Sequence, residues 1–200
     1  ENGRVLDTDH LPMKQALLEI AQTGKANFRF TSNQNLILSD IKKQDKKKIQ
    51  EILDGAGLVR HTEAASPIRK NAIACVALNT CPLALAEAQR YFPQLISRIE
   101  PILEKHGLSD EQIIIRMTGC PNGCARPYAA EIGFIGTAYG RYNLYLGGDR
   151  YGERLNKLYK ESLDEPAILS ELDTLFGTYK NDRHPGEHFG DFAVRKNWIG

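Results

Sequence analysis

The four cysteines of the chain form two short-range pairs that lie far apart in the sequence, and this arrangement constrains the fold more than any other feature. Cys75 and Cys81 are separated by five residues, and Cys120 and Cys124 by three. A site built from four thiolates needs two such pairs brought together by the fold. Disulfides are a weaker interpretation, because a 200-residue chain with four cysteines is too long and too poor in cysteine to depend on them.

Three kinds of cysteine site remain open from the pattern alone, and an iron–sulfur cluster is favoured among them. A structural zinc site usually has two to four residues between paired ligands, so the five-residue gap argues against zinc. Buried free thiols or disulfides are the third possibility. Pro82 at the first position of a helix would place Cys81 beside free N–H groups that favour an anionic sulfur. Gly123 would allow the backbone to approach a bulky inorganic group.

The composition indicates a folded protein, and the net charge predicts no partner that binds by charge alone. The chain is 42% hydrophobic and 26% charged, as in globular proteins, and its length allows one or two domains. A net charge of +1 predicts no binding to nucleic acid or to a membrane surface. No apolar run approaches the ~20 residues that span a bilayer. Without a signal peptide or a starting methionine, the chain is expected to be cytoplasmic and the interior piece of a longer one.

The first sixty residues show a pattern typical of half a ferredoxin-like α+β unit. The segments expected are a strand at residues 4–6, a helix from Leu11 to Gly24, alternating strand residues within 27–38, and a helix over residues 44–53. The polar stretch at residues 62–67 predicts a boundary. The expected domains are therefore a ferredoxin-like half domain at 1–62 and a second domain at 63–200.

The second part has an α/β pattern, which makes the whole chain α+β in fold class. A helical pattern begins at Pro82 and continues to Leu103, with Pro93 and Pro101 expected to kink or divide it. Apolar runs at 113–117, 132–135 and 142–146 predict strands, and residues 155–176 predict two helical segments broken at Pro166.

Two linked motifs give the chain a specific resemblance. Residues 75–87, Cys-Val-Ala-Leu-Asn-Thr-Cys-Pro-Leu-Ala-Leu-Ala-Glu, and residues 118–127, Thr-Gly-Cys-Pro-Asn-Gly-Cys-Ala-Arg-Pro, resemble the siroheme and [4Fe–4S] signature of assimilatory sulfite and nitrite reductases. Residues 28–35 resemble that family's strand–turn element beside the siroheme, and the likeness continues through 141–144 and 146–148. The chain as a whole is similar to the C-terminal half of a sulfite reductase hemoprotein.

The resemblance implies a cofactor site with named residues. Cys75, Cys81, Cys120 and Cys124 would hold a [4Fe–4S] cluster, and Cys124 would also bridge to the siroheme iron. The polar residues implied as contacts to the siroheme macrocycle are Asn33, Gln34, Asn35 and Asn122. For these polar turn residues, hydrogen bonds to their own backbone are an equally weighted interpretation.

The activity implied is the six-electron reduction of sulfite to sulfide in sulfate assimilation. The Cys-Pro-Asn-Gly-Cys-Ala-Arg form resembles sulfite rather than nitrite reductases, and residues 140–144 resemble the NADPH-dependent type. The implied partners are a flavoprotein that oxidises NADPH and the N-terminal half of the parent chain, which would contribute the main sulfite-binding residues. The chain alone is therefore expected to be inactive. The alternatives are a siroheme nitrite reductase fragment and a non-catalytic binding domain stapled by zinc or a cluster.

Other charged clusters are interpreted as surface features. The spacing of His184, His188 and Asp191 could bind a metal, but neighbouring proline and glycine favour a surface loop. Three arginines could attract an anion, form salt bridges or face siroheme carboxylates, namely Arg29, Arg116 and Arg126. The five lysines of the other cluster are expected on a solvated helix face, at positions Lys42, Lys43, Lys46, Lys47 and Lys48.

Overall fold

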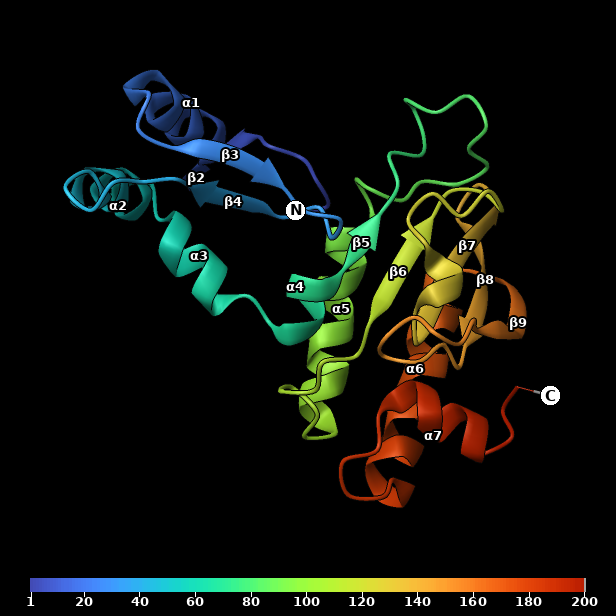
Figure 1. Ribbon diagram of the computed structural model, residues 1–200. Coiled ribbons are helices and arrows are strands. Elements are labelled where there is room, and N and C mark those ends of the chain that lie inside the picture. The colour runs from blue at the N-terminus through green and yellow to red at the C-terminus, as the bar shows by residue number, and fades with distance from the viewer. Residues whose placement is uncertain (200) are drawn as a thin grey trace. The chain divides into compact units, whose positions relative to one another are not determined.

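The computed structural model describes residues 1–199 and divides the chain into two compact units, Glu1–Ala65 and Ser66–Gly200 (Figure 1). The first unit contains two two-stranded antiparallel sheets and three helices. The second contains a five-stranded mixed sheet with helices packed against it. No helix among residues 1–199 is long and apolar enough to cross a membrane.

The first unit is built around the antiparallel hairpin of β3 and β4. Its elements are β1 (Asp7–Thr8), β2 (Leu11–Pro12), α1 (Met13–Thr23), β3 (Asn27–Phe30), β4 (Leu36–Ser39), α2 (Lys46–Gly55) and α3 (Leu58–Ala64). Helix α1 ends at Gly24, whose φ of 64° is left-handed and whose N–H donates to the Ala21 carbonyl at 3.1 Å. The helices and strands expected at residues 11–53 are therefore confirmed, with boundaries shifted by about two residues.

The strand expected at residues 4–6 is wrong. Val5 and Leu6 are exposed and pair with no strand, and the two-residue strand β1 begins after them, at Asp7. A strand needs a neighbour for its backbone groups, so two apolar residues do not create one by themselves.

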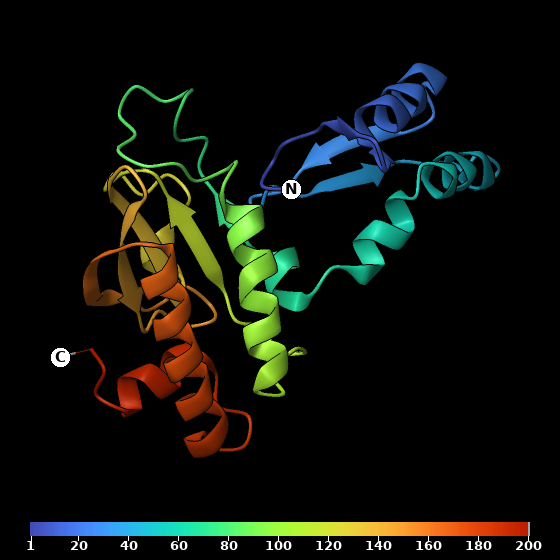
Figure 2. The ribbon, with the colours of Figure 1, turned by 180° about the vertical axis from the view of Figure 1, so that it is seen from behind.

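The second unit has the strand order β5-β6-β7-β8-β9. Strands β5, β6 and β7 are parallel, and β7, β8 and β9 are antiparallel. Helices α5 and α6 cover one face of this sheet (Figure 2). Its elements are α4 (Pro67–Asn71), β5 (Ile73–Ala74), α5 (Phe92–Lys105), β6 (Ile115–Thr118), the 3-10 turn η1 (Pro127–Ala129), β7 (Ile132–Ala138), β8 (Arg141–Leu146), β9 (Lys157–Leu163), α6 (Glu165–Asp182) and α7 (Phe189–Arg195).

The core of the second unit lies between the sheet and its helices. Strand and helix residues contribute fully buried side chains from both sides, which include Ile115, Met117, Phe134, Leu144, Leu95, Ile99, Leu172 and Phe176. The alternation on β8, with even positions 142, 144 and 146 buried, is the period of two that the sequence predicts. The predicted strands near 113–117, 132–135 and 142–146 are confirmed as β6, β7 and β8.

The helix expected from Pro82 is wrong. Residues 82–91 form turns, and α5 begins only at Phe92. The N–H groups of Leu85 and Ala86 donate to the Gly119 carbonyl, at 2.8 and 3.0 Å, instead of to a carbonyl one turn earlier. Because the neighbouring loop takes these backbone hydrogen bonds, the helical spacing of apolar residues produces no helix here, and Leu83 and Leu85 are exposed. Cys81 therefore does not lie at a helix N-terminus.

Prolines do not divide the helices in the way expected. Helix α5 runs unbroken from Phe92 to Lys105, with Pro93 in its first turn and Pro101 inside it. Pro166 does not break a helix but lies in the first turn of α6, where Asp164 caps the end by accepting the Ala167 N–H at 3.1 Å. The residues before it form strand β9 instead of a helix. Polar residues 62–67 are the end of α3 and the Ser66-capped start of α4, so this stretch is more ordered than expected.

Candidate metal centre

Both cysteine pairs lie on loops that leave one edge of the sheet. Cys75 directly follows β5, and Cys120 lies two residues beyond β6. Since these two strands are parallel, their carboxyl ends meet at the same edge, where the loops extend together in Figure 1. The topology therefore brings together segments that are more than forty residues apart in the sequence.

Hydrogen bonds hold the two cysteine loops against each other. The Cys75 N–H donates to the Met117 carbonyl at 3.2 Å. The Gly119 N–H donates to Cys75 Sγ at 3.2 Å, and Thr118 Oγ1 lies 3.4 Å from the same sulfur and 3.3 Å from the Cys120 carbonyl. Donors placed in this way stabilise negative charge on a thiolate.

Gly119 is required at the contact between the loops. A Cβ atom there would lie 2.5 Å from the Ala86 carbonyl oxygen and 2.7 Å from Ala77 Cβ, both closer than atoms tolerate. The same close approach allows the Gly119 carbonyl to accept from two N–H groups of the first loop. A larger residue would separate the loops and remove the N–H bond to the Cys75 sulfur.

The four cysteines are free thiols with different exposure. Cys120 is buried, Cys75 and Cys81 are half-buried, and Cys124 is exposed. The disulfide interpretation is therefore wrong. Within residues 1–199, no three side chains of His, Cys, Asp or Glu converge on one metal ion, as a zinc site with sulfurs about 2.3 Å from the metal requires.

The donor set is of the kind that a [4Fe–4S] cluster uses, since such a cluster is held by four cysteine thiolates. Four free thiols on two adjoining loops, with N–H and O–H donors beside one sulfur, provide this kind of site.

The turn between Cys120 and Cys124 is tightly folded. Gly123 has a φ of 70°, and its N–H donates to the Cys120 carbonyl at 3.5 Å. A Cβ at Gly123 would lie 3.0 Å from the Tyr128 ring, so an aromatic ring, and not an open space, faces this glycine. Tyr128 also donates its hydroxyl to the Pro121 carbonyl at 3.0 Å. Asn122 is exposed in this turn.

The other candidate siroheme contacts lie together in the first unit. Asn33, Gln34 and Asn35 form the turn between β3 and β4, where Thr31 Oγ1 accepts the N–H groups of Asn33 and Asn35 at 3.3 and 3.0 Å. Gln34 has a φ of 59°. The backbone of this turn is thus held by Thr31, which the sequence analysis did not single out.

Arg90 is a second residue that the sequence analysis missed. Its guanidinium donates to the Leu78 carbonyl at 2.6 Å and to Thr80 Oγ1 at 3.2 Å, both inside the loop between the first two cysteines. No periodic pattern or motif singles out this arginine. Arg90 reaches the loop between Cys75 and Cys81 only because residues 82–91 form turns instead of a helix.

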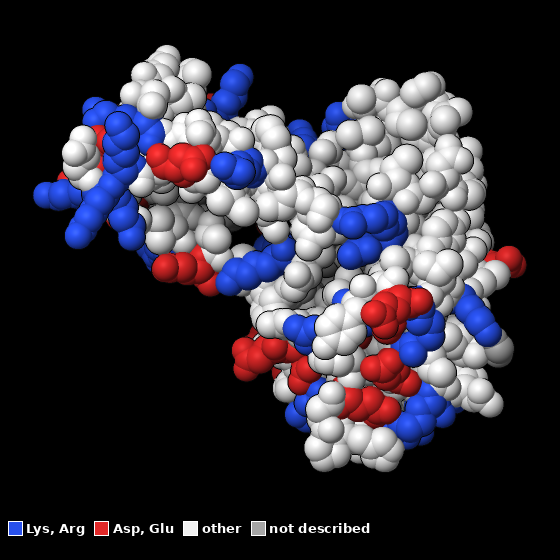
Figure 3. Space-filling view, viewed as in Figure 1, with Lys and Arg blue, Asp and Glu red and all other residues white. Residues whose placement is uncertain are grey.

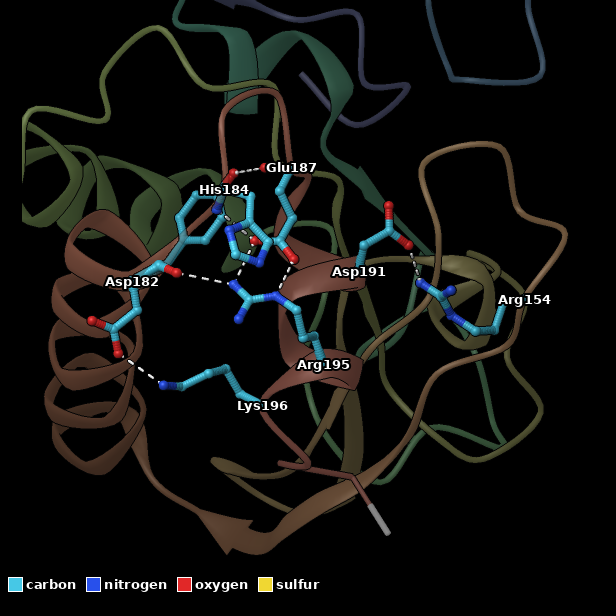
Figure 4. Close-up of polar contacts among 8 residues, drawn as sticks. Arg154, Asp182, His184, Glu187, Asp191, Arg195 and Lys196 are labelled. Atoms are coloured by element: carbon cyan, nitrogen blue, oxygen red, sulfur yellow. Dashed lines mark hydrogen bonds and ion pairs between the residues drawn. The ribbon is translucent and has the colours of Figure 1, made fainter.

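In the histidine cluster near the C-terminus, the neighbouring carboxylates are held in ion pairs (Figure 4). The Glu187 carboxylate forms a two-point ion pair with the Arg195 guanidinium, at 2.6 and 2.7 Å. It also accepts the backbone N–H of His184 at 2.9 Å. These contacts, Arg195 first, lower the pKa of Glu187 to about 2. Asp191 instead pairs with Arg154 at 2.6 Å. The Glu187–Arg195 pair therefore ties the loop after α6 to α7.

The other charged residues singled out from the sequence lie in three different settings. Arg29 binds Asp40 at 3.1 Å, and hydrogen bonds from Asn27 and Arg29 lower the pKa of Asp40 to about 2. Arg116 is half-buried, and burial together with the nearby charge of Arg126 lowers its pKa. The expected solvated lysine face is confirmed, since all five lysines are exposed on and before α2, in the first unit (Figure 3).

Comparison with known proteins agrees with this geometry. The family model described as the nitrite/sulfite reductase ferredoxin-like half domain matches residues 1–56, and the one described as the nitrite and sulphite reductase 4Fe-4S domain matches residues 65–198. The chain is 65% identical over 195 residues to the sulfite reductase [NADPH] hemoprotein beta-component of Leptospira biflexa, covering 98% of this chain and 35% of the relative. The corresponding protein of Escherichia coli is 51% identical over 199 residues, covering all of this chain and 34% of the relative.

A solved structure has the same fold. The Mycobacterium tuberculosis NirA protein superposes with a TM-score of 0.71 at 25% identity, covering 92% of this chain and 36% of that one. The chain thus spans about a third of the length of the relatives it matches. The expected α+β class is confirmed. The expected cofactors are confirmed at the level of the family, because the matching domain is described as 4Fe-4S and the relatives are named hemoproteins. The chain belongs to the nitrite and sulfite reductase family.

Proposed function

We propose that this chain is the C-terminal part of an assimilatory sulfite reductase hemoprotein, which reduces sulfite to sulfide with six electrons. The observation that carries the proposal is the joining of the two cysteine loops at one sheet edge, with the Gly119 N–H on the Cys75 sulfur. The names of the two relatives favour sulfite over nitrite as substrate. The same names do not favour a non-catalytic zinc-stapled domain.

The four cysteines are the proposed ligands of the [4Fe–4S] cluster. Bound cluster and siroheme would supply one-electron transfer and the iron that binds sulfite. The chain's own part is to keep the thiolates in place and their charge stabilised. Gly119 and Thr118 do this for Cys75, and burial shields Cys120 from solvent.

Cys124 is the proposed bridge to the siroheme iron. Its exposure supports this role, because a thiolate that serves a second cofactor must be open on one side. Asn122 beside it is exposed as well. In the same proposal, Asn33, Gln34 and Asn35 contact the macrocycle from a ferredoxin-like half domain at residues 1–62, and residues 63–200 bind siroheme and the cluster.

The proposed partners follow from the type of enzyme. Electrons come from a flavoprotein that oxidises NADPH, and the N-terminal half of the parent chain completes the sulfite pocket. Sulfite is strongly hydrated, so a pocket that removes its water needs several converging cations. We propose Arg116 and Arg126, which lie near each other, as two of these cations. We place the protein in the cytoplasm, where reducing conditions keep four free thiols available.

Anaerobic reconstitution with iron and sulfide tests the proposal. We expect a brown protein with about four irons per chain, as one [4Fe–4S] cluster requires. Uptake of one tightly bound zinc with no iron would overturn it. With reduced methyl viologen and sulfite, the reconstituted 200-residue chain is expected to produce no sulfide, because it spans only about a third of the length of its relatives. Sulfide production at the rate of the full-length hemoprotein would show that the pocket lies within this chain.

A pair of serine variants in the full-length hemoprotein tests the bridging role. Cys124→Ser should uncouple the siroheme from the cluster and also damage the cluster, whereas Cys75→Ser should mainly weaken the cluster. Electron paramagnetic resonance and Mössbauer spectra report both centres. Equal losses confined to the cluster in the two variants would contradict the assignment of Cys124.

A further inference from the structure

The loop between Cys75 and Cys81 lacks regular secondary structure and needs an outside anchor. Inside the loop, only a short turn is formed, in which the N–H groups of Thr80 and Cys81 donate to the Ala77 carbonyl at 3.1 and 2.8 Å. Fixing each backbone residue of such a loop costs about 1–2 kcal/mol of conformational entropy. Two cysteines at its ends would otherwise present their sulfurs in many arrangements.

Arg90 supplies this anchor by binding three acceptors of the loop. Its Nη1 donates to the Leu78 carbonyl at 2.6 Å and reaches the Val76 carbonyl at 3.5 Å, and its Nη2 donates to Thr80 Oγ1 at 3.2 Å. A guanidinium suits this task because its donors are fixed in one plane. Lysine carries the same charge but lacks the planar fork.

The segment that carries Arg90 is itself attached to the sheet. The Gln89 N–H donates to the Cys75 carbonyl at 3.0 Å. The Glu87 carbonyl accepts the hydroxyl of Tyr142, a buried residue of β8, at 2.7 Å, and the Glu87 carboxylate lies 3.9 Å from Arg90. Arg90 therefore links the loop to the sheet and restricts the conformations that the loop can adopt.

We propose that Arg90 is a positioning residue for the Cys75 and Cys81 thiolates, which orders their loop before the cluster binds and holds it afterwards. The inference rests on the proposed function, since it takes these two cysteines as cluster ligands. It adds a residue outside both cysteine motifs, and it assigns the loop's order to a side chain and not to the cluster alone. Its positive charge next to the ligand loop should also favour the reduced, more negative cluster.

The test compares Arg90→Met, Arg90→Lys and the control Arg98→Met in the full-length protein that carries this sequence. Arg98 is a surface arginine of α5 that pairs with Glu165, so its loss removes a comparable charge and ion pair elsewhere. Iron and acid-labile sulfide are measured over time in the presence of a ferrous chelator. We expect Arg90→Met to lose its cluster about tenfold faster than the unsubstituted protein, as is usual for removal of a ligand's supporting partner. Arg98→Met should match the unsubstituted protein.

The reduction potential of the cluster separates charge from geometry. Arg90→Met should shift the potential to a more negative value, while Arg90→Lys, which keeps the charge, should leave it unchanged and still release iron faster. Far-UV circular dichroism checks that each variant is folded. If Arg90→Met does not fold, the rate of iron release from Arg90→Lys tests the inference. The inference would be overturned if a folded Arg90 variant kept its cluster as long as Arg98→Met does and had the same reduction potential. Failure of the unsubstituted protein to hold a cluster would instead overturn the proposed function.

Discussion

The two units differ in how much apolar surface each buries by itself. In the described part of the first unit, the buried apolar side chains are Ala16, Ile20, Ile49 and Leu58. The second unit buries a continuous core between its five-stranded sheet and its helices. Meanwhile the hairpin of the first unit leaves Phe30 85% exposed and Ile37 half exposed.

This contrast indicates that the second unit is stable by its own packing, whereas the first needs a further apolar surface. A two-stranded hairpin with little buried area is marginal in water. An aromatic side chain left on such a hairpin is typical of a surface that another part of a protein covers. The contrast fits the description of residues 1–56 as a half domain.

Core truncation should give the largest difference between the units. Phe134→Ala removes a fully buried ring from the central strand β7 and should lower the free energy of unfolding by about 3–5 kcal/mol. Phe30→Ala is the matched control and should change it by less than about 0.5 kcal/mol in this chain. Urea unfolding measures both. Similar losses from the two substitutions would contradict the contrast.

The buried carboxyl of Glu131 should make the second unit sensitive to pH. Its two oxygens accept the N–H groups of Gly190 and Ile114 at 3.0 and 2.8 Å, and burial raises its pKa above the ordinary 4.5. Below pH 4.5 both folded and unfolded chains hold the proton. As the pH rises above 4.5, the unfolded chain loses it first, so stability falls until the folded-state pKa is passed.

Glu131→Gln removes this titration but puts an amide N–H₂ opposite one backbone N–H. We expect a loss of about 1–3 kcal/mol at pH 4.5, and a smaller loss at pH 7.5, where the unsubstituted chain has lost the contribution of the neutral carboxyl. Denaturant unfolding at both pH values gives the comparison. If the substituted chain keeps the full pH dependence of the original, Glu131 is not its source.

The smallest expected effect is a difference in how salt changes the pKa of two carboxyls. These are Asp40 in the first unit and Glu187 in the second. Both have a pKa of about 2, but the Asp40 side chain is 53% exposed and that of Glu187 only 11%. Each stabilises its unit above its ordinary pKa and loses that contribution as the pH falls towards 2. Salt screens exposed charges more strongly, so 0.5 M salt should raise the pKa of Asp40 by several tenths of a unit and that of Glu187 by less. NMR titration of the carboxyl carbons measures both, and a larger salt response at Glu187 would reverse the ranking.

Local patterns were sufficient for the elements whose hydrogen bonds are local or whose alternation is regular. Helix α1 with its Gly24 end and strands β7 and β8 follow from apolar period and glycine position. The segment 82–91 could not be predicted in this way. Its apolar residues have helical spacing, but its N–H groups bind the Gly119 carbonyl, a partner more than thirty residues away. Strand β9 was missed because only two of its seven residues are partly buried and the rest are exposed, so it carries little apolar pattern.

The sequence by itself determined the chemistry of the candidate centre, which is four thiols in two pairs. A proline follows the first pair, and the second pair encloses a proline and a glycine. The tertiary structure alone decided which groups surround them. The Gly119 N–H reaches Cys75 Sγ, and Arg90 reaches the loop carbonyls, because parallel strands end at one edge and residues 82–91 turn back over it. Such contacts depend on the path of the backbone between distant segments, and side-chain types or spacings along the chain do not specify that path.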